Sequence, residues 1–171
     1  MALTRVLIEN FRSIERCELK PGALTALVGE NNAGKTNILR AIETVLGSDW
    51  VTKNSFSDED FRNRDRDLDI LIELEFDPPL THRPFKAADE VKISTLRYKL
   101  SHYKVNSRHG NKGDRRLETG CFSRDGKPVF VPMEAPKKGV KTQFKPLTSI
   151  PEEVREQVGI ICIWSNRRLA D

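Results

Sequence analysis

Residues 29–36 form an octet, Gly-Glu-Asn-Asn-Ala-Gly-Lys-Thr, that fits the pattern G-x-x-x-x-G-K-[ST]. An apolar run, Leu24–Val28, precedes the octet and is predicted to be a strand, whereas the apolar periodicity of Ile38–Leu46 predicts a helix. A phosphate-binding loop requires this strand-to-helix context. Its glycines let the backbone curl so that successive N–H groups point inward, and the helix adds its positive N-terminal end. The octet therefore predicts an α/β fold built around a phosphate-binding loop.

The pattern also predicts a role for each loop residue. Lys35 is expected to reach the β- and γ-phosphates of ATP, and Thr36 is expected to bind Mg²⁺. The predicted nucleotide-binding residues of the loop are Asn31, Asn32, Ala33, Gly34, Lys35, Thr36 and Asn37. The alternative is a glycine-containing strand-to-helix turn that binds no ligand.

Length and composition restrict the kind of protein. A chain of 171 residues with 37% hydrophobic residues is about one domain and can bury a core. It contains no apolar run long enough to span a membrane and no signal-peptide pattern, so a cytoplasmic protein is expected. Three scattered cysteines, Cys17, Cys121 and Cys162, favour reduced thiols over a disulfide framework, and the histidines show no metal-ligand spacing.

Charge is distributed unevenly along the chain. Residues 1–80 contain 10 Lys/Arg and 15 Asp/Glu, whereas residues 81–145 contain 16 Lys/Arg and 6 Asp/Glu. This asymmetry suggests that the middle segment faces a polyanion or an acidic partner. A solvated insertion is the alternative interpretation, and the segment 107–114 is typical of an exposed loop.

The remaining patterns predict mostly strands. Two strands are expected around the turn Phe11–Ser13, and a half-buried strand is expected from Leu68 until Pro78 stops it. Ser57 and Asp60 resemble a capping box, and the acids 58–60 are expected to stabilise that turn rather than to bind metal. Further strands are expected at 91–105, 117–123, 128–131 and 160–164, with a short helix at 151–158 that has Pro151 at its first position.

Two segments carry a resemblance to a known family. Ile8–Ile14, which contains Asn-Phe-Arg-Ser, and Leu27–Leu39, which contains the octet, resemble the opening of the ATPase head of OLD-family ATP-dependent endonucleases. That family is similar to the DNA-repair ABC-type ATPases that include RecF and SMC proteins. The turn 58–61 and the late strand through Arg167 resemble the same family. The resemblance is dense over residues 3–77, faint across the basic middle and moderate near the end.

The resemblance implies an α/β ABC-type ATPase lobe with a mixed and antiparallel sheet. It divides residues 1–171 into a phosphate-loop core (1–80), a basic β-rich segment (81–145) and a short helix with a buried strand (146–171). It also implies that Arg12 reaches the nucleotide phosphates, although a solvated turn residue is the alternative. Arg167 matches an arginine of the OLD group, and a surface residue is its alternative.

Several parts of an ABC-type head are not found in the sequence. Neither 70–77 nor 160–164 is an apolar strand that ends in the Asp and Glu needed to position Mg²⁺ and activate water. No Leu-Ser-Gly signature segment and no acidic nuclease domain are identified either. We therefore expect an N-terminal lobe, with no catalytic residue of its own, that binds ATP but hydrolyses it negligibly when alone.

Three functional hypotheses follow. The first is the ATP-binding lobe of an ATP-dependent DNA endonuclease, or of a repair or phage-defence ATPase, that acts on DNA as a homodimer or higher oligomer in the intact protein. The second is a non-catalytic, nucleotide-responsive adaptor whose basic segment binds DNA or an acidic protein. The third is a phosphate-loop kinase of a small metabolite. The sequence lacks the arginine-rich lid expected over a transferred phosphate, and the basic segment near Arg115 and Arg116 is what keeps this hypothesis open.

Overall fold

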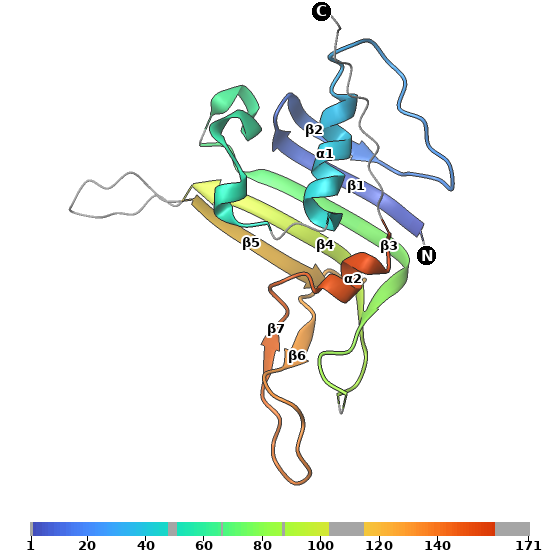
Figure 1. Ribbon diagram of the computed structural model, residues 1–171, viewed down its shortest axis with the longest axis vertical. Coiled ribbons are helices and arrows are strands. Elements are labelled where there is room, and N and C mark those ends of the chain that lie inside the picture. The colour runs from blue at the N-terminus through green and yellow to red at the C-terminus, as the bar shows by residue number, and fades with distance from the viewer. Residues whose placement is uncertain (1, 48–50, 66, 87, 103–114, 160–171) are drawn as a thin grey trace, which may run out of the picture.

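A five-stranded antiparallel sheet forms the centre of the computed structural model, which describes residues 2–47, 51–65, 67–86, 88–102 and 115–159 (Figure 1). The strand order is β2-β1-β3-β4-β5, and a separate two-stranded sheet pairs β6 with β7. The strands are β1 (Ala2–Phe11), β2 (Ile14–Leu19), β3 (Ile70–His82), β4 (Val91–His102), β5 (Arg115–Phe122), β6 (Phe130–Pro132) and β7 (Phe144–Pro146).

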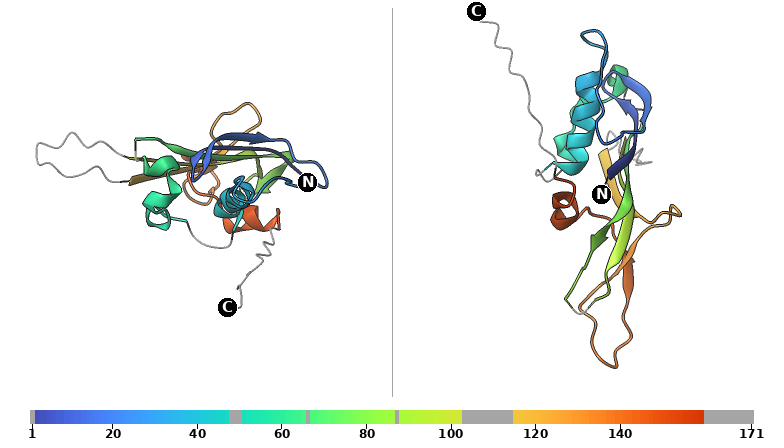
Figure 2. Two further views of the ribbon diagram at one scale, coloured as in Figure 1. Left: turned by 90° about the horizontal axis from the view of Figure 1, so that it is seen from above. Right: turned by 90° about the vertical axis from the view of Figure 1, so that its right-hand side faces the viewer.

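Two α-helices, α1 (Lys35–Leu46) and α2 (Glu152–Glu156), lie on the same face of the sheet (Figure 2). Three short 3₁₀ helices, η1 (Lys53–Ser55), η2 (Asp58–Asp60) and η3 (Arg62–Arg64), connect α1 to β3.

Alternation along the strands sets which side chains meet the helices. In β3, Ile72 and Leu74 are fully buried, and their neighbours across the ladders are apolar side chains such as Ile8 of β1 and Leu96 of β4. The intervening residues of β3 are acidic and face the other side of the sheet. Because side chains alternate between the two faces of a strand, this pattern places the core between the sheet and the helices.

Helix α1 packs on the sheet through one apolar stripe. Ala41, Val45 and Leu46 are buried, and Ile38 and Ile42 are partly buried against the same core. Positions three and four apart share a helix face, so this spacing orients the helix and fixes where its N-terminus points.

The other end of α1 is held by α2. Arg155 is buried, and its Nη1 donates to the carbonyl oxygen of Gly47 at 2.7 Å. A cation at a helix C-terminus also interacts favourably with the helix dipole. The two helices are therefore joined although 108 residues separate the bonded groups.

Much of the predicted layout is confirmed. The hairpin around residues 11–13, the strands β4 and β5 and the short helix near residue 152 all form, with shifted ends. Ser57 and Asp60 make a capping box at η2. The predicted α/β fold class is confirmed, and every strand pair in the described part of the chain is antiparallel.

The prediction of a strand at Leu24–Val28 is wrong for this structure. These residues form no regular element, and Leu24 and Val28 are 95% and 92% exposed. A strand needs a partner for its backbone hydrogen bonds, and no described strand lies alongside this segment. The local apolar pattern is present, but the pairing that would convert it into a strand is not.

Two predicted element ends are also wrong. β3 does not stop at Pro78 but continues to His82, because a register shift between Glu75 and Leu80 accommodates the prolines that cannot donate to the ladder. Pro151 is the N-cap of α2 rather than its first residue. The predicted strand 160–164 and Arg167 lie outside the described residues.

Candidate functional site

The phosphate-binding loop leads directly into α1. Asn32 and Gly34 have positive φ angles, 69° and 86°, and Gly34 is the N-cap of the helix. A left-handed residue at this position suits glycine because it has no Cβ to clash. The backbone thus reverses over a few residues and begins the helix at Lys35, three residues earlier than the apolar periodicity predicted.

Backbone N–H groups are exposed at this helix start. Asn37 and Ile38 both donate to the carbonyl of Gly34, at 2.9 and 3.1 Å. Lys35 and Thr36 precede the first complete turn, so no helical carbonyl is positioned to accept from their N–H groups. No side chain caps this end of the helix within the described chain. Free N–H groups and the positive end of the helix dipole together make an anion-binding geometry.

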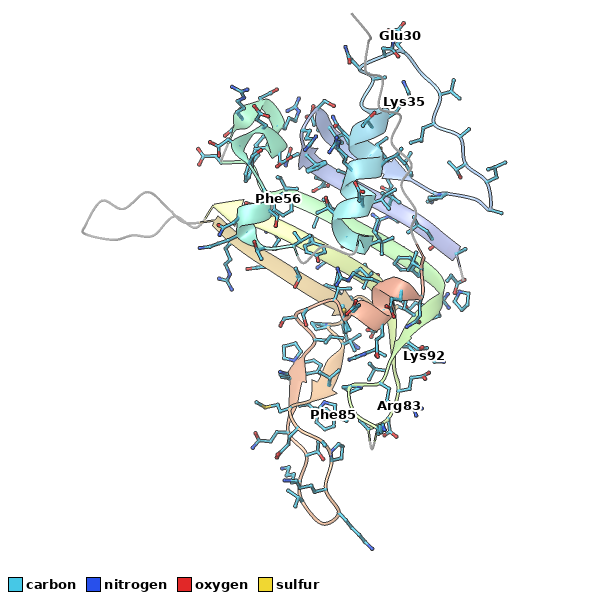
Figure 3. All side chains as sticks on the ribbon, in the orientation of Figure 1. Glu30, Lys35, Phe56, Arg83, Phe85 and Lys92 are labelled. Atoms are coloured by element: carbon cyan, nitrogen blue, oxygen red, sulfur yellow. The ribbon has the colours of Figure 1, made fainter. Side chains whose placement is uncertain are left out.

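The Lys35 side chain folds back over the loop. Its Nζ donates to the carbonyl oxygens of Gly29 at 2.7 Å and of Glu30 at 2.5 Å. Figure 3 shows Lys35 near the start of α1 and Glu30 farther out along the loop (Figure 3). The ammonium group is therefore held at the loop by neutral acceptors, which leaves its positive charge without a carboxylate partner in the described residues. The side chain of Thr36 is exposed on the first turn.

The β1–β2 turn contacts the helix start. Asn37 Nδ2 donates to Ser13 Oγ at 2.9 Å, and a Cβ atom placed on Gly34 would lie 3.2 Å from the same oxygen. Sequence reasoning gave Ser13 no role. Its only signal in the sequence was its place inside the segment Ile8–Ile14, because the contact with Asn37 spans 24 residues.

Arg12 precedes Ser13 in the turn, but its side chain binds Asp60 rather than the phosphate-binding loop. Its Nε and Nη2 bind Asp60 Oδ1 at 2.9 and 2.8 Å, and its backbone N–H donates to the carbonyl of Asp60. Its guanidinium also lies 5.4 Å from the centre of the Phe11 ring. Contact between Arg12 and nucleotide phosphates stays a prediction.

Asp60 is the buried member of the acidic run 58–60. It is 6% exposed, and its Oδ2 accepts from the backbone N–H and the hydroxyl of Ser57. It therefore closes the capping box and neutralises Arg12 at once. No group of three potential metal ligands occurs in the part of the chain that the structure describes.

A pocket of about 390 Å³ opens between α1 and the segment that leads to η2. Arg12 and Asp60 form part of its wall, together with Arg40, Glu43 and Phe56. The phosphate-binding loop does not line this pocket. The β1–β2 turn contacts both, because Phe11 and Arg12 line the pocket and Ser13 is hydrogen-bonded to Asn37 at the helix start.

This combination of an α/β fold and a glycine loop at a helix N-terminus defines a phosphate-loop nucleotide-binding protein. Residues 1–138 match the model of the AAA ATPase domain family. The chain belongs to that family, and nucleotide binding is the property that its ATPase domains share.

Similar proteins include a nuclease and DNA replication and repair proteins. The chain is 49% identical over 84 residues to the OLD nuclease of Thermus scotoductus, a match that covers 48% of this chain and 16% of that protein. It is 31% identical over 100 residues to the DNA replication and repair protein RecF of Vibrio atlanticus (55% of this chain, 28% of that protein). RecF of Shewanella pealeana is 35% identical over 99 residues (55% and 27%).

These matches confirm the resemblance to the OLD and RecF group, and they span less than a third of each relative. A solved structure from work on ATP-driven dimerization and DNA-stimulated activation of SMC ATPases gives a TM-score of 0.44 at 20% identity, over 70% of this chain and 68% of that one. None of the described helices is long and apolar enough to cross a membrane.

Proposed function

We propose that this chain is the ATP-binding lobe of an ATP-dependent DNA endonuclease, or of a related DNA-repair or phage-defence ATPase, that acts in the cytoplasm. The observation that carries the proposal is the start of α1, where Gly34 turns the backbone and no side chain of the described residues caps the first N–H groups of the helix. Family membership and the similarity to OLD nuclease and RecF support the same function.

The loop residues have distinct tasks in this proposal. The backbone of Asn31–Asn37 binds the phosphates, and Lys35 moves from the carbonyls of Gly29 and Glu30 to the β- and γ-phosphates. Thr36 supplies its hydroxyl to Mg²⁺, which bridges the phosphate oxygens. The hydrogen bond between Ser13 and Asn37 holds the β1–β2 turn against the loop. A movement of the loop on nucleotide binding is therefore transmitted to the turn that also carries Arg12.

In this proposal, ATP hydrolysis requires catalytic groups that are not identified in this sequence. An ABC-type head positions water with an acidic residue after an apolar strand and completes the site with a second head. We propose that ATP held by this lobe promotes dimerisation of the intact protein, and that dimerisation controls the cutting of DNA.

Calorimetry of Mg²⁺–ATP binding tests the nucleotide site. We expect Lys35→Ala to weaken binding about 10- to 100-fold, because a charged hydrogen bond to phosphate contributes about 1.5–3 kcal/mol. Lys20→Ala is the matched control, because Lys20 is an exposed lysine that directly follows β2.

Two results contradict the proposal. One is equal ATP affinity for the unaltered chain and Lys35→Ala. The other is the absence of measurable binding by the unaltered chain while its circular dichroism shows a folded sheet. Rapid ATP turnover by the chain alone would contradict only the assignment of hydrolysis to other groups.

A non-catalytic adaptor is the second candidate, and the basic composition of residues 81–145 favours it. An adaptor would change its affinity for DNA on binding ATP without turning ATP over, even in the intact protein. Measurement of ATP turnover by the intact protein with DNA present distinguishes the two functions. Turnover stimulated by DNA supports the ATPase function.

A further inference from the structure

A narrow projection extends from the end of the sheet opposite the phosphate-binding loop (Figures 1 and 2). It consists of residues 129–147, which include β6, β7 and the loop between them, and we call it the basic arm. Its base is fixed to β5, because Val129 N donates to the carbonyl of Cys121 at 2.9 Å and Cys121 N donates to that of Leu147 at 3.2 Å. Val129 and Leu147 are buried there. The base of the arm is thus packed into the core, whereas its outer part extends away from the core.

The outer part of the basic arm carries uncompensated positive charge. Residues 129–147 contain four lysines, at positions 137, 138, 141 and 145, and one glutamate. Lys137 lies 3.9 Å from Glu134, and the other three lysines make no ion pair within the described residues. Like charges gathered on one projection repel each other, and a polyanion relieves that repulsion.

The cations at the root of the arm are, in contrast, already paired. Lys127 binds Asp125 at 2.8 Å, and this contact, with a further hydrogen bond from Ser123, lowers the pKa of Asp125 to about 2. Arg124 pairs with Asp77 at 2.7 Å. The free positive charge is therefore concentrated toward the tip.

Two aromatic rings are exposed on the same arm. Phe130 and Phe144 are 53% and 58% exposed. Phe130 is opposite Pro146, and Phe144 is opposite Pro132, so the two phenylalanines occupy diagonal positions on one face of the ribbon. Exposed aromatic rings and unpaired cations on one projection are the combination that binds unpaired bases and their phosphates.

The edges of the arm are poorly suited to pairing with another strand. Each of its two strands contains a proline, Pro132 in β6 and Pro146 in β7, and proline cannot donate to a β-ladder. A partner is therefore contacted mainly through side chains rather than by strand addition.

A second set of cations lies at the same end of the molecule. The connection between β3 and β4 exposes Arg83 and Lys86, and Lys92 is exposed at the start of β4. Figure 3 shows Arg83 and Lys92 at the end of the molecule from which the arm projects (Figure 3). Together with the lysines of the arm, these cations form a longer positive surface than one acidic side chain requires. A repeating phosphate backbone matches it better than an acidic protein segment does.

We propose that the basic arm binds single-stranded DNA, with its lysines on the phosphates and with Phe130 and Phe144 stacked against bases. This inference deepens the proposed function by assigning a DNA-binding surface, and it rests on that function for the choice of DNA. The surface is remote from the phosphate-binding loop, so the two can be tested separately.

Fluorescence anisotropy of labelled oligothymidylate with the full 171-residue chain tests the inference, at salt concentrations between about 50 and 200 mM. Lys138→Glu is expected to weaken binding about fivefold or more at low salt, whereas the charge-matched control Lys20→Glu leaves it within about twofold. Phe144→Ala is expected to weaken binding about fivefold or more, whereas Leu24→Ala, which also removes an exposed apolar side chain, has little effect.

Each other outcome overturns a defined part of the inference. Equal DNA affinity of the unaltered chain, Lys138→Glu and Phe144→Ala excludes the arm as the DNA-binding surface. Duplex binding as tight as single-strand binding, with no effect of Phe144→Ala, excludes base stacking. Displacement of the DNA by polyglutamate at equal charge favours an acidic protein. Absence of DNA binding by a chain that still binds ATP overturns this inference and leaves the nucleotide site in place.

Discussion

Arg12 and Asp60 show how one ion pair links the neighbourhood of the nucleotide site to the rest of the chain. Arg12 has a positive φ of 54° in the β1–β2 turn, and both its side chain and its backbone bind Asp60. Because Asp60 also completes the capping box of η2 with Ser57, movement of the turn that carries Ser13 would displace the segment 57–60. The pair is thus a structural restraint on the turn that contacts the loop.

Loss of the Asp60 carboxylate should destabilise the fold. We expect Asp60→Ala to lower the free energy of unfolding by about 2–3 kcal/mol, because it removes a cap and the partner of a half-buried guanidinium. Glu59→Ala, which removes an exposed carboxylate paired with Arg64, should cost less than about 0.5 kcal/mol. Urea unfolding measures both values, and equal effects of the two substitutions would contradict this account.

At the scale of elements, α1 and the segment before it differ in what supports them. α1 has an apolar stripe on the core and the Arg155 contact at its C-terminal end. Leu24–Val28 has apolar side chains but neither burial nor a pairing strand. A helix satisfies its own backbone hydrogen bonds, whereas a strand depends on a neighbour. Local apolar patterning therefore accompanies a helix at α1 but no regular secondary structure at Leu24–Val28.

Hydrogen exchange should separate these segments in this chain. Backbone amides of Leu24–Val28 are expected to exchange at least about tenfold faster than those of β1, because no described strand protects them. Mass spectrometry of peptides that cover residues 2–11 and 22–30 measures the difference. Comparable protection would show that the segment is paired in solution and would restore the predicted strand.

At the scale of the whole molecule, the two faces of the sheet have opposite chemistry. The face under α1 and α2 is apolar, whereas the other face carries a network in which Arg5 binds Glu18, Glu73 and Glu75. Glu73 is 8% exposed and also binds Arg97 at 2.6 Å. The hydrogen bond to Glu18, with further contributions from Glu75, raises the pKa of Arg5. Paired arginines and glutamates thus neutralise each other on the face of the sheet that none of the described helices covers.

Removal of the central carboxylate tests the importance of this network. Glu73→Ala is expected to lower the free energy of unfolding by about 2–4 kcal/mol, because two arginines lose a shared and nearly buried acceptor. Glu118→Ala, which breaks an exposed pair with Arg116, is the control and should cost less than about 1 kcal/mol. Thermal unfolding monitored by circular dichroism distinguishes the two, and similar melting temperatures would show that the network contributes little.

Features encoded over short distances could be predicted from the sequence. The phosphate-binding loop, the capping box of Ser57 and Asp60 and the alternation of β3 each depend on residues a few positions apart. The strand at Leu24–Val28 was predicted wrongly because its outcome depends on a neighbour rather than on its own residues. The continuation of β3 past Pro78 was missed because the register shift is a property of the pair with β4.

The sequence alone determined the loop that defines this ATPase-domain chain and the basic composition of its middle. The tertiary structure decided that Ser13 meets Asn37, that Arg12 binds Asp60 and that four lysines and two exposed phenylalanines share one projecting arm. The physical reason is distance along the chain. Motifs and periodicities report backbone geometry over a few residues, whereas contacts between remote segments depend on strand order, register and the packing of the whole core.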